Sequence, residues 1–222
     1  MSHQKEPDPR KDKPASSGAG QINVRETAGG EKPVRRTFPG PRGAKATLRV
    51  AVERNAHAEL IAHAKQSLDA EVCGVLAGQV CEDDEGIFVH VEAVIRGAAA
   101  TEGSTHVTFT QATWNAIYKI LERDHPKLKI VGWYHTHPGW TIFLSQWDLF
   151  IHQNFFKQPW QIALVIDPTL DRAGFFVWNG GQVDHPDAPV APFRLAELEG
   201  WKDILRPRVR IKLTDAPVKV SR

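Results

Sequence analysis

The sequence VGWYHTHPGWTIFLSQWDLF, residues 131–150, is mostly apolar and aromatic but carries two histidines, a serine and an aspartate. His135 and His137 lie two residues apart, and Ser145 and Asp148 lie three apart. A segment this apolar is normally buried, where an unsatisfied polar group costs on the order of 2 kcal/mol or more. We therefore expect these four side chains to bind a ligand or one another.

Hydrophobic periodicity around this stretch predicts a mixture of strands and helices. Alternating or continuous apolar patterns indicate strands at 46–55, 71–80, 87–95, 105–109, 129–137, 160–167 and 173–178. Helical spacing indicates helices at 55–69, at 110–126 and from Ser145 onward. The mixture, with a hairpin at the acidic turn CEDDEG, predicts an α/β (α+β) fold with three layers, in which helices flank a mixed central β-sheet.

Capping residues set the expected limits of the first two helices. Asn55 is expected to be the N-cap of the first helix, whose apolar stripe extends to Leu68. Thr110 is expected to cap the second helix, and Pro126 to end it.

Charge is unevenly distributed along the 222 residues. Residues 1–45 hold 10 Lys and Arg against 5 Asp and Glu, and residues 201–222 hold 7 against 2. The stretch between them holds 11 against 19, a net charge of −8. The body of the chain therefore lacks the basic character expected of a nucleic-acid-binding domain.

Composition divides the chain into three parts. Residues 1–45 are rich in Pro, Gly, Ser, Lys and Arg, which predicts a disordered basic tail. Residues 46–185, which carry the periodic apolar segments, form the predicted folded domain. Residues 186–222 form a predicted extension containing Pro and Arg.

The two cysteines, Cys73 and Cys81, lie eight residues apart in an apolar run that is expected to be extended, so no disulfide is expected between them unless a hairpin intervenes. Two free cysteines are typical of a reducing compartment. No signal-peptide pattern is visible, and the longest aliphatic run is IALVI at 162–166. We expect a soluble cytoplasmic protein without membrane contact.

The polar side chains of residues 131–150 suit a metal ion. His135 and His137 leave the same face at the end of a strand, and a short loop brings Asp148 alongside them. Two nitrogens and one oxygen leave a fourth position open, as in catalytic zinc sites. Ser145 could donate to an oxyanion, and Glu71, at the head of an apolar strand, is the best candidate for a base.

The sequences EVCGVLAG, GWYHTHP and SQWD together resemble the JAMM, or MPN+, metalloproteases. The pattern of that family is an upstream glutamate followed by H-x-H-x7-S-x2-D, and every position is filled here. The resemblance includes the later segment ALVIDP and spans roughly residues 46–180. It implies the three-layer MPN fold, which is similar to that of the cytidine deaminases.

The resemblance also implies a role for each residue. His135, His137 and Asp148 would bind zinc, Glu71 would be general base and acid, and Ser145 would stabilise the oxyanion. The implied substrate is the isopeptide bond between the C-terminus of ubiquitin, or of a ubiquitin-like protein, and a lysine. The loop PGWTIFLS is similar to the active-site loop of the AMSH-like deubiquitinases. The aromatic residues Trp133, Trp140, Phe143 and Trp147 are expected to lie partly in the core; the alternative for Trp140 and Phe143, which lie on the loop, is that they line a groove for an extended C-terminal tail.

The sequence departs from the AMSH-like enzymes after Asp148. The segment LFIHQNFFKQPWQ lacks the Cys and His residues of their second zinc site, so their linkage preference does not carry over. The short connection is similar to that of compact bacterial members found beside ubiquitin-like conjugation genes. His152 lies one helical turn beyond Asp148 and is expected to point away from the strand end, so we leave it out of the ligand set.

Other interpretations accompany these. Ser145 and Asp148 also match the S-x-x-D capping signature, and Glu71 alone could be a solvated acid at a strand edge. A zinc deaminase would need both H-x-E and P-C-x-x-C, and no P-C-x-x-C occurs. The remaining alternatives are a processing peptidase for a β-grasp sulfur-carrier protein and a non-catalytic MPN scaffold subunit. The sequence gives no oligomeric state.

Overall fold

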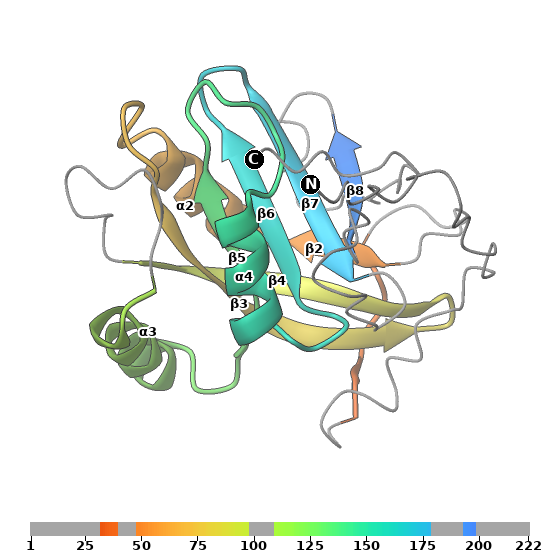
Figure 1. The fold of residues 1–222 in the computed structure, drawn as a ribbon. Coiled ribbons are helices and arrows are strands. Elements are labelled where there is room, and N and C mark those ends of the chain that lie inside the picture. The colour runs from red at the N-terminus through yellow and green to blue at the C-terminus, as the bar shows by residue number, and fades with distance from the viewer. Residues whose placement is uncertain (1–31, 40–47, 98–108, 179–192, 199–222) are drawn as a thin grey trace, which may run out of the picture.

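A computed structural model describes residues 32–39, 48–97 and 109–178, and the backbone of 193–198. Its centre is an eight-stranded mixed sheet (Figure 1) with the order β2-β4-β3-β5-β6-β7-β8 and β1 beside β3. The strands are β1 Val34–Arg35, β2 Arg49–Val52, β3 Cys73–Asp83, β4 Gly86–Arg96, β5 Lys129–Thr136, β6 Ile162–Asp167, β7 Arg172–Trp178 and β8 Phe193–Leu198. The helices of the described residues are α2 Arg54–Ala64, α3 Gln111–Asp124 and α4 Gln146–Phe155.

The central strands of the sheet confirm the predicted hairpin and the mixed pairing. β3 pairs antiparallel with β4 and with β5, whereas β5 pairs parallel with β6 through the crossover that contains α4. Cys73 and Cys81 both lie on β3, and both are buried and free, as their spacing predicted.

Helices cover both faces of the sheet, which confirms the three-layer fold. Residues of β6 alternate between two apolar cores, with Leu164 in one core and Val165 in the other. Leu60 of α2 packs in the core of Leu164. Ile117 of α3 and Ile151 of α4 pack in the core of Val165.

The first helix differs from its prediction at both ends. Its N-cap is Glu53 and not Asn55, and no side chain caps it. The Glu53 N–H still pairs with the β4 carbonyl of Val91, while the Glu53 carbonyl already accepts from His57, so strand and helix meet without a loop. The helix ends at Ala64, and Leu68 is 51% exposed beyond it.

The second helix and the final strands mostly follow prediction. The Thr110 hydroxyl caps α3 by accepting from the Thr113 N–H, and α3 ends before Pro126. The predicted strand at 105–109 falls largely outside the described residues. β8 was not predicted, because the Gly- and Pro-rich segment before it hides a strand only six residues long. The sheet therefore continues beyond the predicted boundary at residue 185.

The expectation of a disordered tail through residue 45 is wrong for residues 32–39. β1 pairs parallel with β3, and Phe38 is only 5% exposed. The Phe38 ring contacts Phe88 edge to face at 5.2 Å. One aromatic side chain thus completes a small apolar cluster at the edge of the domain, separate from the two larger cores, which a count of apolar residues over 45 positions does not detect. The rest of the predicted tail lies outside the described residues.

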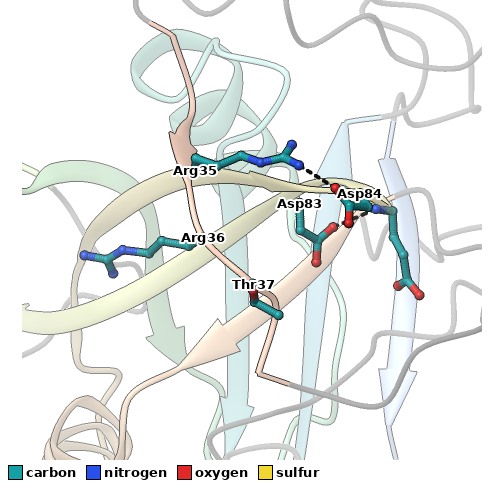
Figure 2. Close-up of a pocket in the computed structure, with 6 residues that line it drawn as sticks. Arg35, Arg36, Thr37, Asp83 and Asp84 are labelled. Carbon is teal, nitrogen blue, oxygen red and sulfur yellow. Dashed lines mark hydrogen bonds and ion pairs between the residues drawn. The ribbon is translucent and has the colours of Figure 1, made fainter.

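Charged side chains fix this N-terminal segment to the β3–β4 turn. Arg49 is buried and donates to Asp83, which also accepts from the Phe38 N–H at 3.0 Å. The guanidinium of Arg49 holds the pKa of Asp83 well below its usual range. The adjoining pocket, drawn in Figure 2, has a volume of about 190 Å³ and is lined by Arg35, Arg36, Thr37, Asp83, Asp84 and Glu85.

The charges of this pocket are paired with one another or with their neighbours. Figure 2 shows Arg35 reaching Asp84, and Arg36 donates to Glu92 at 3.1 Å. These ion pairs therefore tie the N-terminal segment to the β3–β4 hairpin. None of the helices in the described ranges is long and apolar enough to cross a bilayer.

Replacing Phe38 with alanine tests the packing of this segment. We expect Phe38→Ala to lower the free energy of unfolding by about 3 kcal/mol, because it empties a buried aromatic site. Val34→Ala is the control, since Val34 is 40% exposed on the same segment and should change stability by less than about 0.5 kcal/mol. Denaturant unfolding measures both, and equal effects would show that Phe38 does not pack on the sheet.

Candidate metal centre

Two histidines meet at the carboxyl end of β5. The strand places His135 and His137 on one face, and the His137 N–H donates to the Ile166 carbonyl at 2.8 Å, which extends the pairing with β6. Both side chains are buried, and their Nε2 atoms lie 3.0 Å apart. The imidazoles therefore present their ring nitrogens to a single point.

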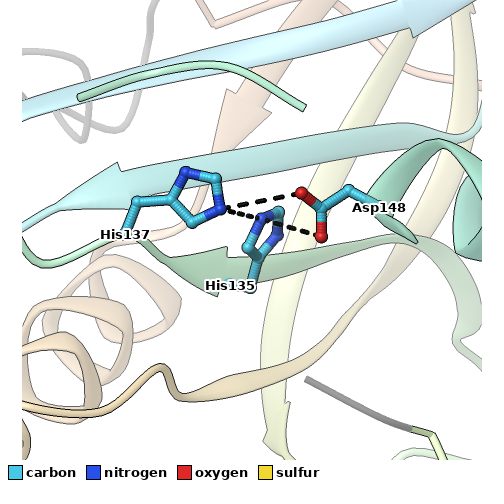
Figure 3. A group of neighbouring side chains, drawn as sticks. All are labelled: His135, His137 and Asp148. Carbon is cyan, nitrogen blue, oxygen red and sulfur yellow. Dashed lines mark hydrogen bonds and ion pairs between the residues drawn. The ribbon is translucent and has the colours of Figure 1, made fainter. Parts of the chain in front are cut away.

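Asp148 reaches the same point from the first turn of α4. As Figure 3 shows, its carboxylate faces both rings: Oδ1 lies 3.3 Å from His135 Nε2, and Oδ2 lies 3.6 Å from His137 Nε2. The Asp148 side chain is only 4% exposed. The structure thus brings together the three predicted ligands from two elements.

The same carboxylate completes a capping box at the start of α4. Asp148 Oδ2 accepts from the Ser145 N–H at 2.7 Å and from the Ser145 hydroxyl at 2.6 Å, and the Asp148 N–H donates back to Ser145 Oγ at 3.2 Å. Capping and facing the histidines are therefore not alternatives. The cap holds Oδ2, which also lies near His137, and leaves Oδ1 facing His135.

The three residues fit a zinc ion. Their ligand atoms all lie within 4.8 Å of one another, and the donor set of two imidazoles and one carboxylate matches zinc chemistry. Burial alone would raise the pKa of Asp148, but attraction to His135 and hydrogen bonds with His135, His137 and Ser145 outweigh it and hold the pKa well below normal. The site is therefore a buried anionic carboxylate beside two convergent imidazoles.

Glu71 lies beside this set but outside it. Its Oε1 is 3.6 Å from His137 Nε2, and its side chain is 22% exposed. Reciprocal bonds between Val72 and Thr136 place it there: the Val72 N–H donates to Thr136 Oγ1, and the Thr136 N–H donates to the Val72 carbonyl, both at 2.9 Å. The arrangement suits a proton-transfer group that approaches the metal position from the solvent side.

Ser145 is committed to the helix cap in this structure. Its hydroxyl donates to Asp148 Oδ2, so donation to an oxyanion would require the hydroxyl to leave that bond. The structure places Ser145 as the residue that orients Asp148. Its role at an oxyanion stays a prediction.

The loop after His137 carries the two aromatics predicted to line a groove. Phe143 packs against the His137 ring, with ring centroids 4.5 Å apart, whereas Trp140 is 73% exposed. Phe143 therefore belongs to the wall of the site, and Trp140 projects into solvent.

Sequence reasoning missed Asp167, which anchors this loop. Asp167 is fully buried at the end of β6, where Oδ1 accepts from Gly139 N–H at 3.1 Å and Oδ2 accepts from Thr141 N–H at 2.8 Å. Oδ1 also accepts from Thr169 and from the Leu170 N–H. Burial alone would raise the pKa of Asp167. The hydrogen bonds that its carboxylate accepts outweigh this effect, so the net pKa lies below the usual value.

The anchor compensates for backbone strain in the loop. Thr141 has a φ of 68°, a left-handed conformation that is costly for a β-branched residue. The bond from Thr141 N–H to Asp167 holds that conformation. The available sequence signal was an aspartate, followed by proline, at the end of a continuous apolar strand.

Comparison with known proteins places these observations in a family. A family model described as "JAB1/Mov34/MPN/PAD-1 ubiquitin protease" matches residues 45–158, which is 114 of the 222 residues. COP9 signalosome complex subunit 5 of Caenorhabditis elegans is 28% identical over 134 residues, covering 59% of this chain and 35% of that protein. The 26S proteasome regulatory subunit rpn11 of Schizosaccharomyces pombe is 26% identical over 130 residues, covering 58% and 41%.

A third relative, COP9 signalosome complex subunit 5 of Eremothecium gossypii, is 36% identical over 119 residues, covering 52% of this chain and 27% of that protein. The matches thus span well under half the length of these three relatives.

Changing Asp167 to asparagine tests the loop anchor. If the amide oxygen of asparagine takes the place of Oδ1, the four hydrogen bonds that Oδ1 accepts remain. The amide nitrogen then takes the place of Oδ2, so that one N–H donor faces another, the Thr141 N–H. We expect the exchange protection of the Thr141 amide to fall, because this amide loses its acceptor, and stability to drop by about 2 kcal/mol. Hydrogen exchange and denaturant unfolding measure these.

The control for this change is Asp171→Asn, at a carboxylate four residues away that is not part of the loop anchor. It should leave the protection of the amides at 139–141 as in the parent protein. Unchanged protection at Thr141 in Asp167→Asn would contradict the anchoring role.

Proposed function

The chain belongs to the JAB1/Mov34/MPN/PAD-1 ubiquitin protease family, also known as the JAMM or MPN+ family, and on that premise we propose that it is a zinc-dependent isopeptidase. Its proposed substrate is the bond after the C-terminal glycine of ubiquitin or of a ubiquitin-like modifier. The observation that carries the proposal is the convergence of His135, His137 and Asp148, with Glu71 beside them. A scaffold subunit would not need this complete set.

The chemistry divides between the ion and the chain. A zinc ion held by three protein ligands supplies a Lewis acid and lowers the pKa of a water toward about 7. His135, His137 and Asp148 would hold it, with Asp148 Oδ1 turned inward by the capping box.

Glu71 moves the protons in this scheme. Its carboxylate takes a proton from the water as the oxygen attacks the glycine carbonyl. It then gives that proton to the lysine nitrogen as the carbon–nitrogen bond breaks, which leaves a free carboxylate and a free amine. Its exposure of 22% gives it access to both solvent and substrate.

Ser145 and the loop complete the proposed site. When the tetrahedral oxyanion forms, the Ser145 hydroxyl transfers its hydrogen bond from Asp148 to that oxygen. Phe143 and the loop fixed by Asp167 form the wall beside His137, where an extended modifier tail would lie. Modifiers of the ubiquitin type, including β-grasp sulfur carriers, would use the same site.

Elemental analysis tests the metal proposal. We expect about one zinc per chain in the purified protein, and we expect His137→Ala to lose most of it because two ligands hold zinc poorly. His125→Ala is the control, since His125 caps α3 away from the site. Full zinc occupancy in His137→Ala would remove His137 from the ligand set.

Changing Glu71 to glutamine tests the mechanism. The amide keeps the size of the side chain but cannot accept a proton, so turnover should fall about 10²-fold or more while zinc content stays the same. Turnover is measured on a panel of ubiquitin and ubiquitin-like proteins fused through their C-terminal glycine, with and without chelator.

The panel also assigns the substrate. Glu82→Gln, at a half-buried glutamate on the opposite end of β3 from Glu71, is the matched control and should retain turnover. Loss of zinc in Glu71→Gln would make Glu71 a ligand, and full turnover would remove it from the mechanism. Cleavage of none of the fusions by the zinc-loaded parent protein would contradict the isopeptidase proposal.

A further inference from the structure

A buried histidine behind the metal centre has no part in the proposed reaction. His152 lies on α4, one turn beyond Asp148, and is fully buried. Its ring packs near the rings of Phe156 and Trp178, with centroids 5.9 Å and 5.2 Å away. Burial lowers the pKa of His152 to about 3, so the ring is neutral.

His152 holds the indole of Trp133. The Trp133 Nε1–H donates to His152 Nδ1 at 2.9 Å, and Trp133 is itself fully buried on β5. Because Nδ1 accepts, the proton of this neutral imidazole lies on Nε2. The bond links α4 to β5.

Trp133 in turn lies flat against a metal ligand. Its ring centroid is 4.6 Å from that of His135, and the two planes differ by only 11°. Trp133 is also nearly parallel to Phe156, at 5.8 Å and 16°. The His135 ring therefore rests on an indole whose own plane is fixed by a hydrogen bond and by packing.

The stacking of Trp133 on His135 takes the place of a hydrogen bond that metal-binding histidines usually make. A metal-bound histidine normally donates its second ring N–H to a carboxylate or carbonyl, which fixes the ring plane. Within the described residues, His135 Nδ1 is buried and has no hydrogen-bond partner. Stacking on Trp133 is the contact that can fix the plane of His135 in its place.

We propose that Trp133 and His152 are a positioning pair for the metal ligand His135, with Trp133 setting the plane of the His135 ring and His152 holding Trp133. The inference rests on the proposed metal site. It explains why a polar ring is buried in this apolar core, and why His152 lies near the site without facing it.

Variants at His152 separate positioning from packing. His152→Leu fills similar space but leaves the Trp133 N–H buried without an acceptor. His152→Asn places an amide oxygen near the position of Nδ1 and can restore the bond. We expect the zinc dissociation constant to rise about tenfold in His152→Leu, the usual scale for groups that orient a ligand, and less than about threefold in His152→Asn.

The matched control is His63→Leu. His63 is also buried, has a pKa lowered to about 4 mainly by burial, and shares a 2.7 Å hydrogen bond with Tyr134. It lies on α2, however, against the opposite face of the sheet from His135. His63→Leu should destabilise the fold without changing zinc affinity.

The readouts are the zinc dissociation constant from chelator competition and the visible absorption spectrum of the Co²⁺-loaded protein. His152→Leu should alter the Co²⁺ bands, whereas His152→Asn and His63→Leu should keep the parent spectrum. A purely structural role would lower the unfolding free energy of all three variants and leave affinity and spectrum unchanged, and that result would overturn the inference.

A further variant keeps the test decisive if His152→Leu does not fold. Trp133→Phe keeps a ring beside His135 but removes the N–H donor, and it should also weaken zinc binding about tenfold. Parent affinity in Trp133→Phe would overturn the inference. Failure of the parent protein to bind zinc or Co²⁺ would instead refute the metal site, so the two proposals fail in different ways.

Discussion

The Asp148 carboxylate both caps helix α4 and faces the two histidines, and the candidate metal centre depends on its doing both. Oδ2 satisfies the Ser145 amide and hydroxyl at the start of α4, which leaves Oδ1 facing His135. A free carboxylate would lose rotational freedom on binding a metal ion. Here the helix has already fixed it, so the loop and the helix start are parts of one preorganised site.

Strand order explains how the other groups reach the same place. β5 lies between β3 and β6, so the start of β3 brings Glu71 to the end of β5 and the end of β6 brings Asp167 to the loop that follows. The parallel pairing of β5 with β6 requires a crossover, and α4 within that crossover carries Asp148. The proposed ligands, the proposed base and the loop anchor thus converge because of a single topology.

The central sheet and the site residues were predictable because their signals are local. Period-two patterns mark the strands. The four residues His135, His137, Ser145 and Asp148 can be recognised by their spacing because all four lie at the end of one strand and the start of the next helix. The burial of Phe38 and the anchoring by Asp167 were not predictable. Each depends on contacts with residues far away in the chain, which no local pattern encodes.

The central claim is that two imidazoles and one carboxylate hold a zinc ion with one position left open. X-ray absorption at the zinc edge of the zinc-loaded protein tests it most directly. The account predicts a first shell of nitrogen and oxygen at about 2.0–2.1 Å, with outer-shell scattering from two imidazoles and no sulfur. A sulfur scatterer at about 2.3 Å, or scattering from fewer than two imidazoles, would contradict it.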